Sequence, residues 1–571
     1  MTTTQTLTPN AGFKAEAAGA GRFDGWTFGA SLVALAIAVP LLTVIGLALF
    51  PAENIWGHLA STVLPRLMWT TLLLMAGVAI GTTLIGVGSA WLVGTYQFPG
   101  RRIFEWALLL PLAVPSYVIA FVYTDLLEYA GPVQGVLRDV FGWTTPHDYW
   151  FPDIRSLGGA IAMMSLVLYP YVYLLTRAAF LEQSAGVLEV ARTLGRSPWQ
   201  EFIQVAVPLA RPSIVVGVSL AMMETLNDFG TVDFFGVQTL TLGIFDVWLN
   251  MNNVGGAAQI AILMLAVVIG LIFAERYARR KQRFHHSARR YKRPGRKKLS
   301  PFWGMLAILA CLAPLGLGFI LPLSILGADS YVHFDEVLES GFAGSALNSL
   351  MLSGLAALFA VSVGVFLAYG IRLRGHRFLV VVTRFASVGY AVPGAVLAIG
   401  VLIPMAWFDN QLDGFLRDAF DISSGLLLSG TIAALTFAYV VRFLALSLGA
   451  VETSLGRITA NIDGAARALG ATPGQALIKV HLPIIRASLL TAAILVFVDG
   501  MKELPMTTVM RPFNFETLAT QVHQFASAEQ FEQAAPAALA IVAVGIIPVI
   551  FLSLAMNRAV YGRDDAAEGM I

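Results

Sequence analysis

Four acidic side chains fall in strongly apolar stretches of this chain. Glu224 and Asp228 lie four residues apart, and Asp499 and Glu503 repeat that spacing 275 residues later. Carboxylate oxygens are hard ligands that suit hard cations. An ionisable group within a membrane span costs roughly 2.5–3.5 kcal/mol on insertion scales, so it should face a polar interior. The pattern predicts opposed carboxylates along a cation path; the alternative is that the acids mark the hydrated outer ends of short spans.

Two neighbouring polar residues, Asn227 and Lys502, complete this predicted pathway. Lys502 precedes Glu503 and can neutralise it, which weakens the cation interpretation. No tightly bound metal is expected at these positions, because tight binding would stop release. Selectivity is expected in an external binding protein instead.

A polar segment occurs twice, as a first copy (residues 189–208) and a second copy (residues 464–483). Both follow the pattern Ala-x-x-Leu-Gly, and a Val-Pro or Leu-Pro pair closes each copy. The glycine predicts a tight helix exit, and a proline three residues later opens the next turn. The candidate contact residues are Glu189, Ala191, Gly195 and Pro208 in the first copy, and Ala465, Ala466, Gly470 and Pro483 in the second.

A single basic amphipathic loop helix is more often an interfacial element than a docking helix. Two copies with one spacing reverse that preference, because a soluble dimer offers two equivalent clefts. The second copy has Gly464 at the position of Glu189, with Asp463 one residue earlier. This departure concerns the acidic contact of the second copy and not the segment itself.

The composition is that of a membrane protein. Of 571 residues, 57% are hydrophobic and 13% are charged, and the mean hydropathy is +0.73. A soluble domain carries about 25% charged residues, whereas apolar runs of about 20 residues cross a bilayer as helices. We predict an all-α polytopic membrane protein with about twelve spans, near residues 28–50, 70–95, 105–128, 157–180, 209–228, 257–275, 302–327, 345–370, 380–408, 425–448, 485–505 and 534–557.

A basic run at residues 276–300 divides the chain into two homologous halves. A nucleic-acid site is the alternative, but a basic run between two spans follows the positive-inside rule. Arginines in alternate loops agree, so both termini are expected in the cytoplasm. The predicted parts are a disordered cytoplasmic tail (1–27), a first transmembrane domain (28–275), a basic cytoplasmic linker (276–300), a second transmembrane domain (301–560) and a cytoplasmic tail (561–571).

The two halves point the same way across the membrane, because an even number of spans separates equivalent positions. This predicts a pseudo-two-fold axis along the membrane normal, with a path between the halves. The sequence contains no phosphate-binding loop, zinc-helix motif or nucleophile elbow. We therefore expect a non-catalytic subunit that binds no cofactor.

At this point the repeated segment resembles the coupling loop of ATP-binding-cassette (ABC) importer permeases. Four further stretches resemble the fused, two-domain permeases of bacterial ferric-iron uptake systems. The resemblance covers nearly the whole chain outside the N-terminal tail and the linker. The four stretches are Pro111–Phe121, Glu224–Val232, Asp499–Thr507 and Arg511–Phe513.

The resemblance implies a multi-pass permease of the bacterial inner membrane that translocates ferric iron. It further implies two cytoplasmic ABC ATPase subunits, as a homodimer, which use ATP–Mg, and a periplasmic or extracellular iron-binding protein. The lipid bilayer is the remaining partner, and no nucleic acid is expected. Two alternatives stay open: a permease for thiamine, an organophosphonate or a polyamine, and an ion-coupled secondary transporter.

Overall fold

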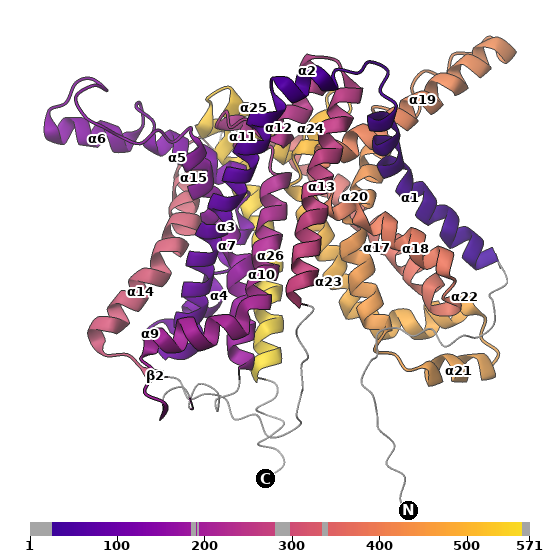
Figure 1. Cartoon of the computed structure of the whole chain (residues 1–571). Helices are drawn as coiled ribbons and strands as arrows, with labels where there is room; N and C mark the ends of the chain where they lie inside the picture. The colour runs from indigo at the N-terminus through magenta and orange to yellow at the C-terminus, as the bar shows by residue number, and fades with distance from the viewer. Residues whose placement is uncertain (1–24, 184–189, 191–192, 280–296, 334–340, 562–571) are drawn as a thin grey trace, which may run out of the picture. The chain divides into compact units, whose positions relative to one another are not determined.

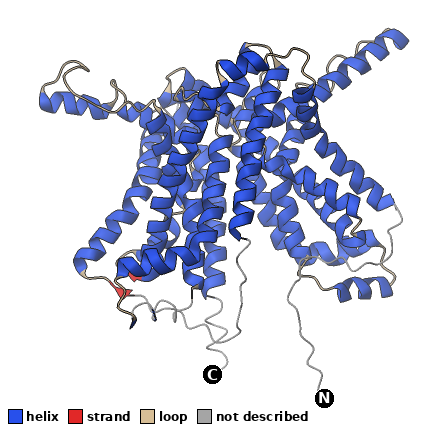
Figure 2. Cartoon of the chain, viewed as in Figure 1, coloured by secondary structure: helices blue, strands red, loops and turns tan. Residues whose placement is uncertain are grey.

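The computed structural model describes residues 25–183, 190, 193–279, 297–333 and 341–561. These residues are almost entirely helical, which confirms the predicted all-α polytopic class (Figure 1, Figure 2). Among them, eleven helical spans are long and apolar enough to cross a membrane, and one bent pair makes a twelfth. Six of these spans lie in the first half or at its junction with the second. Four are single helices: α1 (Gly25–Leu49), α3 (Leu64–Thr95), α7 (Leu157–Glu182) and α13 (Val254–Arg279). The other two each join three elements: α9 (Pro198–Glu201), η2 (Phe202–Ala206) and α10 (Val207–Asn227), and α14 (Pro301–Leu315), η4 (Gly316–Ile320) and α15 (Leu321–Val332).

The remaining spans belong to the second half. They are α17 (Phe342–Arg374), α19 (Gly394–Phe420), α20 (Ile432–Leu455), α26 (Phe531–Tyr561), and α23 (Leu482–Met501) preceded by α22 (Pro473–Ala476) and η6 (Leu477–His481). Short elements join the spans. They are α2 (Trp56–Ser61), α6 (Pro132–Phe141), α11 (Gly230–Phe234), α12 (Leu240–Phe245), η3 (Asp246–Asn250), α18 (Arg377–Ala386), η5 (Ser387–Ala391), α21 (Ala460–Ala468), α24 (Pro505–Met510) and α25 (Leu518–Ser527).

The span predicted near residues 105–128 is a bent pair of helical runs. The helical run formed by α4 (Arg101–Ala107) and η1 (Leu110–Ala113) meets the run that begins with α5 (Ser116–Leu127) at 90°. Proline forces the preceding residue into extended backbone, and Val114, before Pro115, has ψ 120°. The second half breaks at the equivalent place, where α19 begins directly after Pro393.

Equivalent hydrogen bonds recur in both halves. The backbone N–H of Leu240, at the start of α12, donates to Thr71 Oγ1 on α3 at 2.9 Å. The backbone N–H of Leu518, at the start of α25, donates to Ser349 Oγ on α17 at 2.7 Å. Each pair in the second half follows its counterpart by 278 residues. The internal repeat therefore extends to tertiary contacts.

The chain forms two compact units that do not coincide with the two sequence halves. The small unit comprises residues 1–39, 357–390 and 440–493, and the large unit comprises the remainder. Within the small unit, Trp26 of α1 packs on Phe366 and Tyr369 of α17, with ring centroids 5.1 and 5.6 Å away. Within the large unit, α14 packs on α3 and α4. The first helix of each half thus packs against the other half.

Two short strands make a small addition to the predicted all-helical fold. Strand β1 (Tyr96–Gln97) follows α3 and pairs in parallel with β2 (Lys297–Lys298), which precedes α14. The pairing fixes the end of the basic linker to the first half. In Figure 1, the large unit carries β2, α4 and α9 at one end and α2, α11, α12 and α25 at the other.

Candidate translocation and coupling sites

Asp228 begins the first of two equivalent turns in the large unit. It follows α10, and its Oδ1 accepts the backbone N–H of Thr231 at 2.8 Å. Its Oδ2 accepts the Thr231 hydroxyl at 3.1 Å and also the hydroxyl of Ser116 on α5. Thr231 lies in the first turn of α11, and Asp228 lies one residue before the N-cap position, Phe229. Asp228 therefore takes the capping role for this helix.

Glu503 occupies the equivalent place in the second half and accepts N–H groups of α24 in the same way. Its carboxylate accepts the backbone N–H groups of Met506 and Thr507 of α24 at 3.2 and 3.3 Å. The Thr507 hydroxyl adds a bond at 3.2 Å, and Glu503 is only 5% exposed. A carboxylate in the first turn of a helix also gains from the helix dipole. Both acids are therefore satisfied by helix N-termini.

The two capped turns meet at Tyr117 of α5. A methyl group added at Gly230 of α11 would lie 2.7 Å from Tyr117 Cβ and 2.8 Å from Leu504 Cδ2. Leu504 immediately follows Glu503, so segments equivalent by the repeat are in contact. Tyr117 is buried, and its hydroxyl has no hydrogen-bond partner among the described residues. The equivalent turns are thus adjacent, and the carboxylates of Asp228 and Glu503 are engaged in capping.

The other predicted pathway residues lie on the ends of α10 and α23. Glu224 is half-buried, and Asn227 is buried at the end of the same helix. Lys502 Nζ lies 3.3 Å from Asp499 Oδ1, so the lysine pairs with Asp499 and not with its sequence neighbour Glu503. The reason is helical geometry, because residues three apart share a face and adjacent residues do not.

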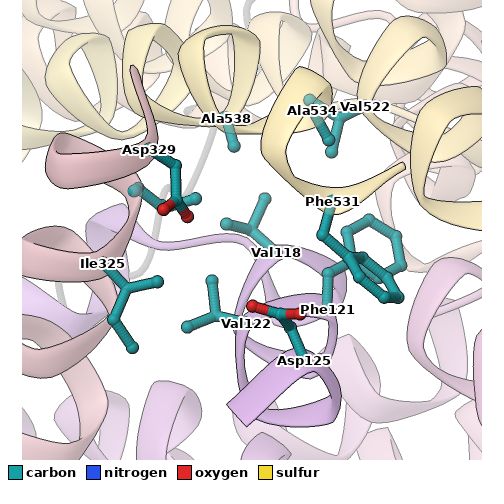
Figure 3. A pocket seen from close by; sticks show the side chains of 11 residues that line it. Val118, Phe121, Val122, Asp125, Ile325, Asp329, Val522, Phe531, Ala534 and Ala538 are labelled. Atoms are coloured by element: carbon teal, nitrogen blue, oxygen red, sulfur yellow. The ribbon is translucent and has the colours of Figure 1, made fainter. Parts of the chain in front are cut away.

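A small pocket near these turns contains two acids that the sequence analysis did not single out as pathway residues. Asp125 of α5 and Asp329 of α15 point into a cavity of about 20 Å³, roughly the space of one water, between α5, α15, α25 and α26 (Figure 3). Asp125 lies in an apolar stretch, so the rule that selected Glu224 would have found it as well. No group of three or more metal-ligating side chains occurs in the described part of the chain.

Neighbouring acids around this pocket have basic partners. Arg155 forms ion pairs with Glu128 and with Glu529, the latter at 3.2 Å. His333 Nε2 lies 2.9 Å from Glu532 Oε2. Within the described ranges no ion pair involves Asp125 or Asp329.

A further contact joins the halves beside the first capped turn. His523 Nε2 of α25 lies 3.6 Å from Asp233 Oδ2 of α11. Burial raises the pKa of Asp233, and the nearby Asp246 carboxylate adds to that increase. Burial also lowers the pKa of His523. Both shifts favour the neutral form of each side chain at this contact.

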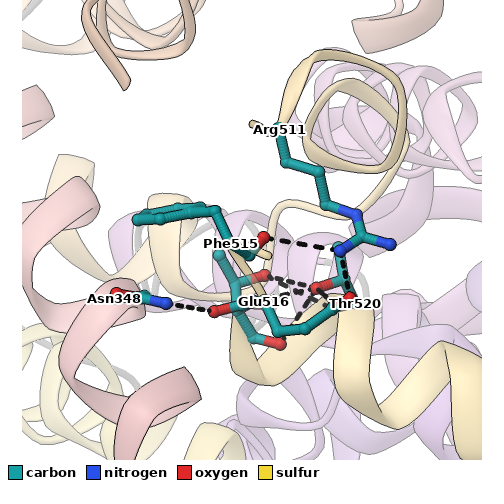
Figure 4. A network of polar contacts seen from close by, with 6 residues as sticks. Asn348, Arg511, Phe515, Glu516 and Thr520 are labelled. Atoms are coloured by element: carbon teal, nitrogen blue, oxygen red, sulfur yellow. Dashed lines mark hydrogen bonds and ion pairs between the residues drawn. The ribbon is translucent and has the colours of Figure 1, made fainter. Parts of the chain in front are cut away.

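The loop between α24 and α25 is held by a polar network (Figure 4). Arg511 pairs with Glu516, and Thr520 Oγ1 donates to the other Glu516 oxygen at 2.8 Å. The side-chain amide of Asn348 on α17 donates to the Glu516 backbone carbonyl at 2.9 Å. Phe513 lies between these anchors and is fully exposed. The network fixes both ends of the loop in the large unit.

The second copy of the repeated segment folds as helix, turn, helix in the small unit. Helix α21 ends before Gly470, whose φ of +80° only glycine adopts without strain. Thr472 and Gln475 then form a reciprocal capping box at the start of α22. Leu469, at the tip of the turn, is 88% exposed. Ala465 is exposed and Ala466 is buried, so the short helix α21 has one free face.

The first copy repeats this geometry where the structure describes it. Gly195 has φ +77°, and Ser197 with Gln200 forms the capping box of α9. Leu194 is 74% exposed at the position equivalent to Leu469. The predicted contact residues Glu189 and Ala191 lie outside the described residues.

Both copies end in one turn of π-helix. The π turns η2 and η6 lie at equivalent positions, and Pro208 and Pro483 follow them by two residues. Proline has no N–H to donate to the helix ladder, and helices accommodate such breaks with π-bulges. Both prolines are exposed at the start of the following span.

Within the small unit, the second copy is anchored by the Arg372 cluster, which consists of Arg372, Asp463 and His481. Asp463 Oδ2 accepts the Arg372 guanidinium at 2.6 Å, and Asp463 Oδ1 lies 2.8 Å from His481 Nε2. The guanidinium also donates to the carbonyls of Leu455 and Ile458 at 2.5 and 2.9 Å. The acid near the position of Glu189 therefore points toward α17 and not outward.

Residues 83–283 match the family model described as the binding-protein-dependent transport system inner membrane component. Residues 83–283 therefore contain an ABC permease domain, as the motif resemblance predicts, and the helical fold and the spans are those of a multi-pass inner-membrane permease.

Among its relatives, the chain is 27% identical to the Fe(3+)-transport system permease protein FbpB 2 of Haemophilus influenzae, over 85% of this chain and 89% of that one. It is 28% identical to the molybdenum transport system permease protein ModB of Escherichia coli, over 34% of this chain and 84% of the relative. It is also 28% identical to the sulfate transport system permease protein CysT of Escherichia coli, over 42% of this chain and 86% of the relative.

Proposed function

We propose that this chain is the translocation subunit of a ferric-iron importer. The observation that carries the substrate is the whole-length similarity to a permease named for Fe(3+) transport, which extends through both halves. The relatives named for molybdenum and sulfate cover less than half of this chain. The fused arrangement therefore favours iron over an oxyanion.

The repeated segment supports energy coupling to an external ATPase. Each copy presents an exposed leucine beside a glycine of positive φ, at positions 275 residues apart. Two equivalent protrusions fit the two clefts of an ATPase homodimer. ATP–Mg would then be bound and hydrolysed in those subunits, and this chain would bind no cofactor and catalyse no reaction. Both termini would lie on the same cytoplasmic side as the segments.

The charge distribution supports a cation. Asp125 and Asp329 face one small pocket, and Glu224 lies half-buried on α10. Asp499, at the equivalent place on α23, is half-buried as well but pairs with Lys502. Concentrated negative potential raises the local concentration of a cation and repels an anion. No tight metal site is needed, since an external iron-binding protein would select the ion and these residues would only pass it on.

In the proposed cycle, ATP closes the ATPase dimer and moves the two docked segments together. The halves then rock about the path between them and expose it alternately to the two sides. An organophosphonate, thiamine or polyamine remains an alternative solute for the same machinery. An ion-coupled transporter is disfavoured, because it would have no use for the two copies of the segment.

Uptake of radioactive iron(III) tests the proposal in cells that lack this chain. Wild type should restore uptake, and the double variant Glu224→Ala with Asp499→Ala should lose it at equal expression. The matched control is Asp139→Ala with Asp418→Ala, two exposed acids on α6 and α19. Labelled thiamine and molybdate serve as competing solutes. Restored uptake of either, with no iron uptake, would keep the importer and reject iron.

A further inference from the structure

A lateral groove follows the seam between α3 and α14 in the large unit. It consists of two adjoining cavities of about 700 and 390 Å³ that share Gly88, Leu92 and Ala310. Pockets that bind drug-sized ligands measure about 300–1,000 Å³. The larger cavity is lined by aromatic side chains at one end: Trp91, Tyr96, Trp199, Phe202 and Trp303.

The groove is long enough to hold the part of a lipid chain that lies within one leaflet. Its lining residues on α14 and η4 run from Trp303 to Leu317, about 21 Å at 1.5 Å per residue. One leaflet of the hydrocarbon core is about 15 Å deep. Both lining helices belong to membrane spans, so the groove lies at membrane depth.

The second half supplies an internal comparison. Gly88 on α3 is equivalent to Phe366 on α17, and Trp91 is equivalent to Tyr369. In the small unit, Trp26 packs on both Phe366 and Tyr369 and fills that seam. A side chain added at Gly88 would meet no atom within 4 Å. The protein's own aromatic rings thus fill one seam, while the equivalent seam in the first half stays open.

Basic side chains mark the aromatic end of the groove. Lys297 and Lys298 directly precede Leu299, a lining residue, and the pairing of β2 with β1 holds them beside Tyr96. Lys298 is exposed, and Lys297 Nζ lies 3.5 Å from the buried Glu201 carboxylate. Aromatic rings and lysines at the end of a span are typical of the lipid headgroup region. Lysines there attract anionic lipids.

We propose that this groove binds one acyl chain of an anionic phospholipid, with its phosphate held at Lys297 and Lys298. The acyl chain lies along α3 and α14, at the place that aromatic side chains fill in the equivalent seam of the second half. Pro198, Trp199 and Phe202 of the first copy also line the groove. Bound lipid therefore supports the first copy of the repeated segment. Lipid binding itself does not depend on which solute is transported.

Native mass spectrometry of the full chain with its ATPase partner tests the site. After delipidation, palmitoyl-oleoyl phosphatidylglycerol or phosphatidylcholine is added back. Wild type should retain one phosphatidylglycerol that Gly88→Phe loses, because the ring fills the groove as Phe366 does in the second half. The matched control is Gly354→Phe on α17, a glycine that also has open space and lies outside the groove. Equal retention by wild type and Gly88→Phe would overturn the site.

A separate variant tests the proposed contact between the lipid phosphate and the lysines. Lys298→Glu should reduce the preference for phosphatidylglycerol over phosphatidylcholine about fivefold, while one lipid chain is still retained. Equal retention of both lipids by wild type would overturn the phosphate assignment.

Fluorescence supplies a second measurement that does not depend on filling the groove. Phosphatidylglycerol brominated in its acyl chain should quench tryptophan emission at low lipid ratios. Trp303→Phe, which leaves the groove open, should lose a share of that quenching. Unchanged quenching in Trp303→Phe would place the lipid elsewhere. Neither experiment measures solute uptake. The lipid site can therefore be tested even if the transported solute is not iron.

Discussion

At the scale of single residues, Asp228 and Glu503 show how a membrane protein places charge in an apolar region. Each acid accepts N–H groups of a helix that begins beside it. These donors would otherwise lack partners, since the first N–H groups of a helix have none within it. One arrangement therefore satisfies both the carboxylate and the helix.

Capping and charge can be separated at Asp228. Asp228→Ala should lower the free energy of unfolding by about 1 kcal/mol, the usual cost of a lost helix cap. Asp228→Asn should lower the free energy of unfolding much less, because the asparagine amide oxygen can still accept the Thr231 N–H. Thermal unfolding at fixed pH and detergent compares the two, with exposed Asp139→Ala as control. Equal losses for both Asp228 variants would show that charge, not capping, matters there.

At the scale of elements, the repeated segment depends on a glycine turn. The added side chain at Gly195 or Gly470 would meet no atom within 4 Å, so any cost of substitution comes from the backbone. A positive φ disfavours β-branched residues most strongly. The turn geometry is therefore separable from packing.

Gly195→Val and Gly470→Val should uncouple transport from ATP hydrolysis while membrane insertion stays normal. The strained turn would misplace the exposed leucine that precedes each glycine. Uptake and ATPase activity are measured together in proteoliposomes. Gly464→Ala, which also has open space but an ordinary helical φ, is the matched control. Normal uptake by both valine variants would rule out docking through these turns.

The Arg372 cluster links the second copy to α17 and should transmit its movement. Arg372→Met keeps the aliphatic stem but removes the bonds to Asp463 and to two backbone carbonyls. We expect a loss of about 1–3 kcal/mol in stability, as for hydrogen bonds to charged groups, and weaker stimulation of uptake by ATP.

The control for this variant is Arg384→Met in the same unit. Arg384 pairs with Glu452 but is largely exposed, and exposed ion pairs contribute little. Thermal unfolding and ATP-driven uptake are compared between the two variants. Equal effects of Arg372→Met and Arg384→Met would remove any special role for the cluster.

At the scale of the whole molecule, two related halves are fused and exchange their first helices. Helix α1 packs on α17 of the second half, and α14 packs on α3 and α4 of the first. Neither half is thus complete without the other. A fused chain ensures that both halves are made together.

The fused halves should bind two ATPase subunits per chain, one at each copy of the segment. Replacing Leu194 or Leu469 with cysteine, in a Cys311→Ala background, provides one reactive site per copy. Each single-cysteine chain should cross-link one ATPase subunit, and the double variant should cross-link two, as judged by mass on denaturing gels. Cross-linking by only one of the two positions would contradict the symmetric docking.

Much of the architecture was determined by local sequence. Apolar runs set the helical spans, and Gly195 and Gly470 set the turns of the repeated segment, because these features depend on neighbouring residues alone. Val114 before Pro115 also carried the signal for the bend in the span near residues 105–128. The repeat spacing correctly paired Asp228 with Glu503.

Only the tertiary structure decided which partners those side chains take. Asp228 and Glu503 bind helix N-termini, Lys502 turns to Asp499, and Asp463 turns inward to Arg372. The partner of a charged group depends on which donor reaches it through space, and sequence spacing alone does not state that. The groove at Gly88 is a further case, since whether a seam is filled depends on side chains far apart along the chain.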